Sequence, residues 1–241
     1  MTNYIHEMKQ LLTIVFLLLF SMYIKAQEER AFLPVDWESI RKEVKENPDS
    51  IKELVKRLSA QETDTTMTYP EKVLAFYGQS FLINDSEDAF KNDMYKLANS
   101  GKLKECLAVA KIMLDINPIN LIALTTANDV IRSMAINPIR WGNVSVLEAK
   151  IYYNRAMRIF DTIAMTGDGS EKHPFYVTKI SDEYCFMRHY LHLWKYKGQE
   201  ATLNCDIIKL GETSKYYNRP EIFFEVTRVY ELERQRVMMG K

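Results

Sequence analysis

The feature that most constrains the fold of this chain is a change of hydrophobic periodicity after residue 166. Over 35–166, apolar side chains recur every three or four positions, which is the spacing of one helix face. Over 175–232, they alternate with polar ones, and aromatic and β-branched residues become frequent. Helices followed by strands are typical of the α+β class. We therefore expect a mainly helical region over 35–166 and an antiparallel β-meander within 175–232.

Breaks in this pattern separate the expected helices. Asn47-Pro48 parts two short helices, and Pro70 opens the next at its first turn, where the missing N–H of proline leaves no hydrogen bond unmade. We expect Gly78 to end that helix, and the turn at 167–170 to end a long one. The expected helices cover 36–58 (two helices), 70–78, 86–98, 103–114, 121–131 and 145–165.

The helices between 86 and 131 are joined by a glycine turn and an Asn-Pro step, an arrangement that resembles a tetratricopeptide repeat. That repeat has a glycine near the start of its second helix, small residues within the helix and a proline at its end. Gly101, Ala110 and Pro118 fit this spacing, and Cys106 stands where alanine is usual. The sequence contains one convincing unit of this kind, and we expect the helices around it to pack as similar helical hairpins.

Strand patterns occur at four places after the long helix. Leu203, Cys205 and Ile207 alternate with polar neighbours and are the expected buried face of one strand. A hairpin turn is expected at 197–200, where lysine, glycine, glutamine and glutamate follow one another. The expected strands cover 175–180, 184–196, 202–210 and 221–230.

Residues 8–26 are typical of a cleavable secretory signal peptide. Lys9 precedes an apolar stretch over 11–20, and the small residue Ala26 stands before a polar segment. The apolar stretch is shorter than the roughly 20 apolar residues that a membrane-spanning helix needs. We therefore expect cleavage near Ala26, with an uncleaved membrane anchor as the alternative.

Cleavage near Ala26 divides the chain into a signal peptide, 1–26, and a mature part, 27–241, which we expect to form a single α+β domain. We expect translation to start at Met8, with Met1 as the alternative. No cysteine follows the apolar stretch, so a lipid-modified N-terminus is not expected. The mature protein is expected to be soluble, in the periplasm or outside the cell, without stable membrane insertion.

The charge balance bears on the kind of partner. The chain has 32 Lys and Arg residues against 32 Asp and Glu residues. Two Lys and one Glu lie in 1–26, which leaves 30 against 31 in the mature part. Proteins that bind nucleic acid usually carry a basic excess on one face. We therefore expect no nucleic-acid partner, and the expected partner is another envelope protein or a peptide.

Several short segments of the chain occur in a recognisable order and together span most of the mature part. They are 35–40, 64–68, 76–78, 166–170, 182–184, 205–206 and 223–225. Each segment alone is unspecific, but their order resembles the Bacteroidetes domain-of-unknown-function family DUF4919. One departure from the family pattern is Gln79, which stands where an aromatic residue is expected. The resemblance implies an exported helical-plus-strand protein of gut-type bacteria, and it implies no catalytic residues because no reaction is assigned to the family.

Acidic residues near 168–183 are the first candidates for chemistry. Asp168, with Ser170 and Glu171, lies in a glycine-rich turn and supplies oxygen ligands for a hard cation. A cation loop needs more ligands than these, and no helix opens directly after the turn to bind a phosphate. The preferred interpretation of this segment is a helix end and a tight turn.

Asp182, Glu183 and Asp206 are candidates for a catalytic carboxylate pair of the kind that glycosidases use. The sequence does not give their separation. Asp182 and Glu183 lie at the expected start of a strand, where acidic residues commonly form turns. A structural role is therefore preferred for them.

His173, His189 and His192 are candidates for metal ligands. In a strand, residues three apart point to opposite faces, which separates His189 from His192. His173 lies before Pro174 in a loop and has no evident partner. We expect structural histidines here and no metal site.

Three cysteines, Cys106, Cys185 and Cys205, cannot all pair within one chain. We expect buried free thiols, with a Cys185–Cys205 disulfide as the alternative. As a nucleophile, Cys185 or Cys205 would need a nearby base and a lowered pKa, and the apolar segments around both favour the opposite.

The aromatic side chains of the last third are the strongest candidates for a binding surface. We expect about half of them to pack against the helices and the outward half to form a face that binds a sugar or a peptide. The residues in question are Tyr184, Phe186, Tyr190, Trp194, Tyr196, Phe223 and Phe224.

The sequence thus favours an exported, non-enzymatic interaction or structural protein of the bacterial cell envelope. The alternative is an envelope-associated hydrolase or small-ligand-binding protein that uses the acidic residues near 168–183. We expect no catalytic residue, no metal ligand and no cofactor.

Overall fold

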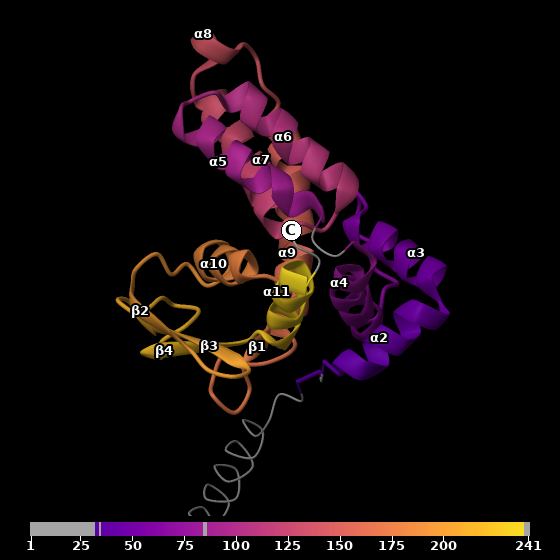
Figure 1. Ribbon diagram of the computed structural model, residues 1–241. Coiled ribbons are helices and arrows are strands. Elements are labelled where there is room, and N and C mark those ends of the chain that lie inside the picture. Colours follow the sequence, from indigo (N-terminus) through magenta and orange to yellow (C-terminus); the bar gives the residue numbers. More distant parts are fainter. Residues whose placement is uncertain (1–31, 34, 84–85, 239–241) are drawn as a thin grey trace, which may run out of the picture. The chain divides into compact units, whose positions relative to one another are not determined.

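The computed structural model describes residues 32–33, 35–83 and 86–238, and from residue 33 onward they cluster in one compact unit (Figure 1). The predicted signal peptide, the start at Met8 and the cleavage site near Ala26 lie outside the described residues. The described chain is α+β, as the periodicity predicts, with most helices before a sheet. None of its helices is long and apolar enough to cross a membrane.

The helical region is predicted closely. Helices α5, α6 and α7 pack against one another in chain order, and α9 packs along α7 (Figure 1). Gly101 has a φ of +71° in the turn before α6, a conformation that glycine adopts without strain. The elements are α2 (Trp37–Glu46), α3 (Pro48–Ser59), α4 (Tyr69–Ile83), the 3₁₀ helix η1 (Ser86–Phe90), α5 (Lys91–Asn99), α6 (Leu103–Ile116), α7 (Leu121–Ile136), α8 (Pro138–Trp141) and α9 (Val146–Ala164).

Gly78 does not end its helix, and this prediction is wrong. Helix α4 continues for another five residues to Ile83. A Cβ atom at position 78 would lie 3.1 Å from Ile51 Cγ2 and 3.3 Å from Val44 Cγ2. The glycine therefore serves the close packing of α4 against α2 and α3 and does not act as a helix terminator.

The sheet is mixed, which corrects the predicted antiparallel meander. Its strand order is β1-β4-β3-β2, so the last strand lies inside the sheet. Strand β1 pairs in parallel with β4, whereas β4 with β3 and β3 with β2 are antiparallel. The remaining elements are β1 (Phe175–Tyr176), α10 (Ile180–His189), β2 (Tyr196–Ala201), β3 (Cys205–Leu210), β4 (Glu221–Glu225) and α11 (Thr227–Met238).

The segment 184–196, predicted as a strand, is mostly helix α10. The carboxylate of Asp182 accepts hydrogen bonds from the backbone N–H groups of Thr178 and Lys179 at 3.3 and 3.1 Å, which caps the start of this helix. Acidic residues occupy its first turn, and Arg188 and His189 its last, a charge order that suits the helix dipole. These terminal signals outweigh the β-propensity of the aromatic residues between them.

Three further predictions about the strands need correction. Residues 197–200 belong to strand β2, and the chain turns at 202–204 instead. In β3 the buried side chains are Asp206, Ile208 and Leu210, the opposite face from the one expected. The final strand ends at Glu225, after which the chain forms helix α11. The pattern of β4 itself is confirmed, since Ile222 and Phe224 are buried.

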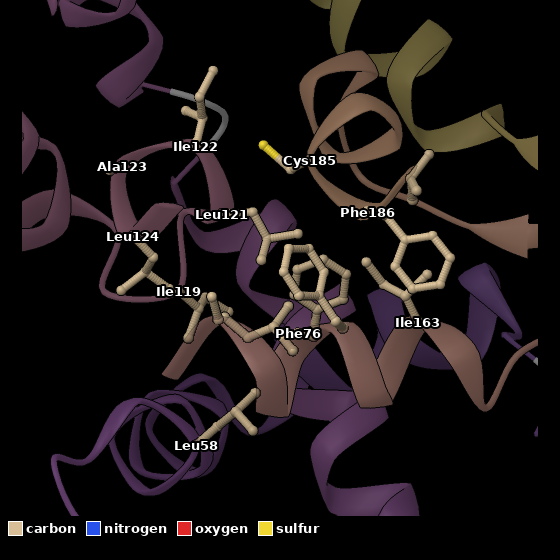
Figure 2. Close-up of a cluster of buried hydrophobic side chains, with 14 of the residues drawn as sticks. Leu58, Phe76, Ile119, Leu121, Ile122, Ala123, Leu124, Ile163, Cys185 and Phe186 are labelled. Carbon is tan, nitrogen blue, oxygen red and sulfur yellow. The ribbon is translucent and has the colours of Figure 1, made fainter. Parts of the chain in front are cut away.

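One core joins the helices to the sheet. Figure 2 shows side chains from α3, α4, α7, α9 and α10 meeting in it, among them Leu58, Phe76, Leu124, Ile163 and Phe186. Phe186 of α10 also packs edge-on against Phe224 of β4, with 6.3 Å between ring centroids. Helix α10 therefore lies between the helical region and one face of the sheet.

Candidate functional site

A pocket of about 370 Å³ lies between helices α7 and α10, near the start of strand β2. Each helix contributes four or five residues at the i, i+3, i+4, i+7 spacing of a single helix face. The volume falls within the range typical of ligand sites, roughly 300–1,000 Å³. The residues that carry its chemistry are Thr125 and Asp129 of α7, Tyr184, Cys185, Arg188 and His189 of α10, and Tyr95 and Tyr196.

Aromatic side chains form the rim of this pocket. Tyr184 packs against Tyr196 with 5.6 Å between ring centroids, and His189 packs against Trp194 at 6.5 Å. The Trp194 side chain is 60% exposed and the Tyr196 side chain is 52% exposed. A group of exposed aromatic rings beside a pocket is typical of a binding surface.

Arg188 supplies a positive charge at the same rim. Its guanidinium lies over the ring of Trp194, 5.4 Å from the centroid. Within the described part of the chain it forms no hydrogen bond and no ion pair. The guanidinium is therefore available to an anionic group of a ligand.

The thiol in the pocket is not an activated nucleophile. Burial raises the pKa of Cys185 to about 12, and its Sγ atom lies 3.7 Å from the hydroxyl of Thr125. Burial likewise lowers the pKa of His189, whose Nε2 atom is 4.0 Å from Asp129 Oδ2. A neutral thiol and a neutral imidazole do not provide the thiolate–imidazolium pair of cysteine enzymes.

The acidic residues named from the sequence come together only in part. Glu183 is fully buried, and neither of its carboxyl oxygens accepts a hydrogen bond from a described residue. Burial, followed by the nearby charges of Asp206 and Asp182, raises the pKa of Glu183 well above its usual value. A proton on Glu183 turns its contact with Asp206 from a repulsion into a hydrogen bond.

The carboxyl pair of Glu183 and Asp206 does not line the pocket between α7 and α10. It is linked to the rim through one amide side chain. Gln199 donates from Nε2 to Asp206 Oδ2 at 2.7 Å and accepts from the Tyr184 hydroxyl at 2.6 Å. Gln199 therefore connects Tyr184 at the rim to the buried carboxyl pair.

Asp168 has a structural role. Its carboxylate accepts hydrogen bonds from the backbone N–H and the hydroxyl of Ser170, and it forms an ion pair with Arg219 at 2.6 Å. Gly169 beside it has a φ of +72°, and a Cβ there would lie 2.8 Å from the Tyr217 hydroxyl. These contacts make the segment a closed turn, which was the preferred interpretation of the sequence.

The histidines do not gather at one site, and the cysteines do not pair. His192 stacks on Tyr216 at 4.9 Å between ring centroids, and His189 lies in the pocket. Cys106, Cys185 and Cys205 are all free thiols, so the alternative Cys185–Cys205 disulfide is not formed. No group of three His, Cys, Asp or Glu residues within the described ranges is arranged to hold a metal ion.

A buried polar cluster around Glu87 was not predicted. Oε1 of Glu87 accepts hydrogen bonds from Asn117 at 2.6 Å and Asn120 at 3.0 Å, and it forms an ion pair with Lys179 at 2.6 Å. These partners lie 30 to 92 residues away along the chain. A sequence signal exists only for Asn120, which caps helix α7 by accepting from the backbone N–H of Ala123.

The candidate aromatic surface divides as expected. Phe186 and Phe224 are fully buried, whereas Trp194 and Tyr196 are exposed, and Tyr184 is half-buried at the pocket rim. The exposed members gather at the pocket between α7 and α10. The sequence indicates which aromatic residues are candidates. Their arrangement around the pocket depends on α10 being a helix, whereas the sequence predicts a strand.

The chain matches a known protein family over most of its length. The model of the family described as "Domain of unknown function (DUF4919)" matches residues 38–235, which is most of the chain. No curated protein and no solved structure matches. The matched segment includes both helices of the pocket and the whole sheet. The chain belongs to the DUF4919 family.

Proposed function

We propose that this chain is an exported, non-enzymatic interaction protein of the bacterial cell envelope, and that it holds a segment of a partner protein in the pocket between α7 and α10. One observation carries the proposal. The exposed rings of Tyr95 and Tyr196 line a pocket that also contains Arg188, whose guanidinium forms no ion pair with a described residue. The exposed ring of Trp194 packs beside it, against Arg188 and His189. Tryptophan, tyrosine and arginine are the residues that contribute most to binding at protein interfaces.

The hydrolase alternative has less support. Its acidic residues are each engaged elsewhere: Asp168 pairs with Arg219, and Asp182 caps α10. Glu183 is buried behind the pocket, and its pKa is raised by burial and by Asp206. A hydrolase that uses two carboxylates needs both beside a substrate-sized space. Asp182 and Glu183 do not line the pocket between α7 and α10.

Export rests on the predicted signal peptide. We expect N-terminal sequencing of the secreted protein to find Gln27 or a near neighbour, because cleavage is predicted after Ala26. Recovery of the uncleaved chain from the soluble cytoplasm would contradict this part of the proposal and leave the pocket untouched.

The binding role is tested by crosslinking from the pocket. A photoreactive phenylalanine analogue is placed at Tyr196 and, as a matched control, at Tyr153 of α9, which is similarly exposed at 45%. In cells of the native species, we expect a discrete crosslinked protein from position 196 and none from position 153. Equal crosslinking from the two positions, or none from either, would count against the pocket.

A further inference from the structure

Strand β2 has a free edge beside the pocket. It stands at the end of the strand order β1-β4-β3-β2, so no other strand of the described chain pairs with its outer side. Its residues are exposed except for Gly198, which is half-buried. An open strand edge presents unpaired N–H and C=O groups, which a further strand can satisfy.

The backbone groups on that edge can be assigned from the hydrogen bonds to β3. Thr202 donates to the carbonyl of Cys205 at 2.8 Å, which fixes one hydrogen-bonded position of the ladder. Because such positions alternate in an antiparallel pair, Glu200 also bonds to β3, and Gln199 and Ala201 direct their N–H and C=O groups outward. Beyond the bulge at 196–198, the bond from Gly211 to the Lys195 carbonyl leaves Tyr196 outward as well.

The same positions also face the pocket with their side chains. Tyr196 is opposite Leu210 and Gln199 is opposite Ile208, and directly opposed residues share one face of a sheet. Gln199 bonds to Tyr184, which confirms that this face is the one next to α10. A strand added outside β2 would therefore direct every second side chain toward Tyr184, Tyr196 and Arg188.

The charges around the edge favour an acidic occupant. Arg188, Lys195 and Lys197 form no ion pair with any residue that the structure describes. Of the neighbouring carboxylates, Glu200 pairs with Lys209. Glu212 and Asp129 accept from neutral donors, the backbone N–H of Lys195 at 2.9 Å and the Asn128 amide at 2.8 Å, and keep their charge. The three cations outnumber these two carboxylates, so positive charge is in excess at this place.

We propose that an acidic segment of the partner protein adds as a fifth strand to the free edge of β2 and places an acidic side chain on Arg188. This inference rests on the proposed function and names the chemistry and conformation of its partner. A second copy of the chain is the alternative occupant of this edge, and the oligomeric state of the protein in solution distinguishes it. A partner strand with alternating carboxylates meets Lys195 and Lys197 favourably.

The probe is a short synthetic peptide in which glutamate and valine alternate, titrated calorimetrically into the mature protein. Two comparison peptides isolate the two parts of the proposal. In the first, lysine replaces glutamate. In the second, every other backbone nitrogen is methylated, which keeps the charges and removes strand hydrogen bonds. We expect the glutamate peptide to bind, and each comparison peptide to bind at least about tenfold more weakly.

Two pairs of variants place the peptide on the protein. Arg188→Glu is compared with Arg140→Glu, since Arg140 also lies over a tryptophan ring, that of Trp141. Ala201→Pro removes an outward N–H from the edge, and Ala201→Val keeps it. We expect about tenfold weaker binding for Arg188→Glu and Ala201→Pro only.

Each outcome has a distinct meaning. If binding is weakened by Arg188→Glu but not by Ala201→Pro or by backbone methylation, the peptide does not add as a strand. The pocket then remains a binding site. No binding of the glutamate peptide overturns the acidic partner, and the crosslink from Tyr196 then decides the proposed function separately. A dimer in light scattering that Ala201→Pro dissociates would make a second copy the occupant of this edge.

Discussion

Two buried glutamates, one in the helical region and one beside the sheet, show opposite solutions to the same problem. Glu87 in η1 and Glu183 in α10 both have no exposed surface. Glu87 meets two amide donors and the ammonium of Lys179. Glu183 meets no donor among the described residues and faces the carboxylate of Asp206. Burial alone therefore does not decide the state of a carboxyl group; the donors that the fold brings to it do.

The difference has a structural consequence for each region. The Glu87 ion pair joins η1 to the start of α10, and the two asparagines join it to the connection between α6 and α7. It thereby ties together three segments of the chain. Glu183 ties α10 to β3 only while it carries a proton. The contact of α10 with β3 is therefore expected to depend on pH.

The largest effect is expected from removing the cation of the first region. Lys179→Met leaves the buried Glu87 without its charge partner, and the loss of one partner of a buried pair costs about 3–5 kcal/mol. Urea denaturation measures this loss of unfolding free energy. The double variant Glu87→Gln with Lys179→Met is the control, and it should recover much of the loss because it removes the unpaired charge. A loss below about 1 kcal/mol for Lys179→Met would contradict the comparison.

A smaller effect of opposite sign is expected at Glu183. Because the pKa of Glu183 is raised in the folded state, folding favours its protonated form. The stability gained in this way is fully present below the unfolded-state pKa of about 4.3 and is lost as the pH rises through the folded-state pKa. Glu183→Gln cannot ionise, so it should be more stable than the parent at pH 7 by about 1–2 kcal/mol, the range for a buried polar group without donors. Thermal unfolding across pH should show this difference shrinking toward pH 4. A variant that is less stable at pH 7 would show that Glu183 has a partner.

The smallest effect is expected at an exposed carboxylate, which completes the series. Burial alone would raise the pKa of Asp168, but hydrogen bonds from Arg219 and Ser170 bring it to about 2. The stability it contributes is present above the unfolded-state pKa of 3.8 and is lost as the pH falls through about 2. Because both side chains are more than one-third exposed, Asp168→Asn should cost less than about 1 kcal/mol at pH 7. If Asp168→Asn lowered the unfolding free energy as much as Lys179→Met does, the proposed difference between exposed and buried ion pairs would be wrong.

Much of the helical region could be predicted because its boundaries are local. Asn47-Pro48, Gly101 and Pro118 each mark a helix end in the sequence, and the structure has breaks at all three. The prediction at Gly78 is wrong because the need for a small residue there comes from Ile51 and Val44, which lie on other helices.

The sheet and the site could be predicted only in part. Tyr184, Phe186 and Tyr190 favour a strand by propensity, yet the cap from Asp182 and the packing of Phe186 make this segment a helix. In a helix these aromatic side chains point in other directions than they would in a strand. The pocket could therefore not be predicted from the sequence, although Tyr184 and Tyr196 are candidate binding residues there. Glu87 was missed because its partners are distant in the chain.

The position of β4 inside the sheet bears on how this protein is made. It is the last strand to leave the ribosome, and it pairs with β1, about fifty residues earlier, and with β3. Until β4 is present, both of those strands expose an edge that native pairing will later cover. Contacts of this sequence separation form slowly, so the sheet should complete after the helices. A chain that ends early, before residue 221, would keep two open edges and is expected to aggregate, even with every helix before β1 intact.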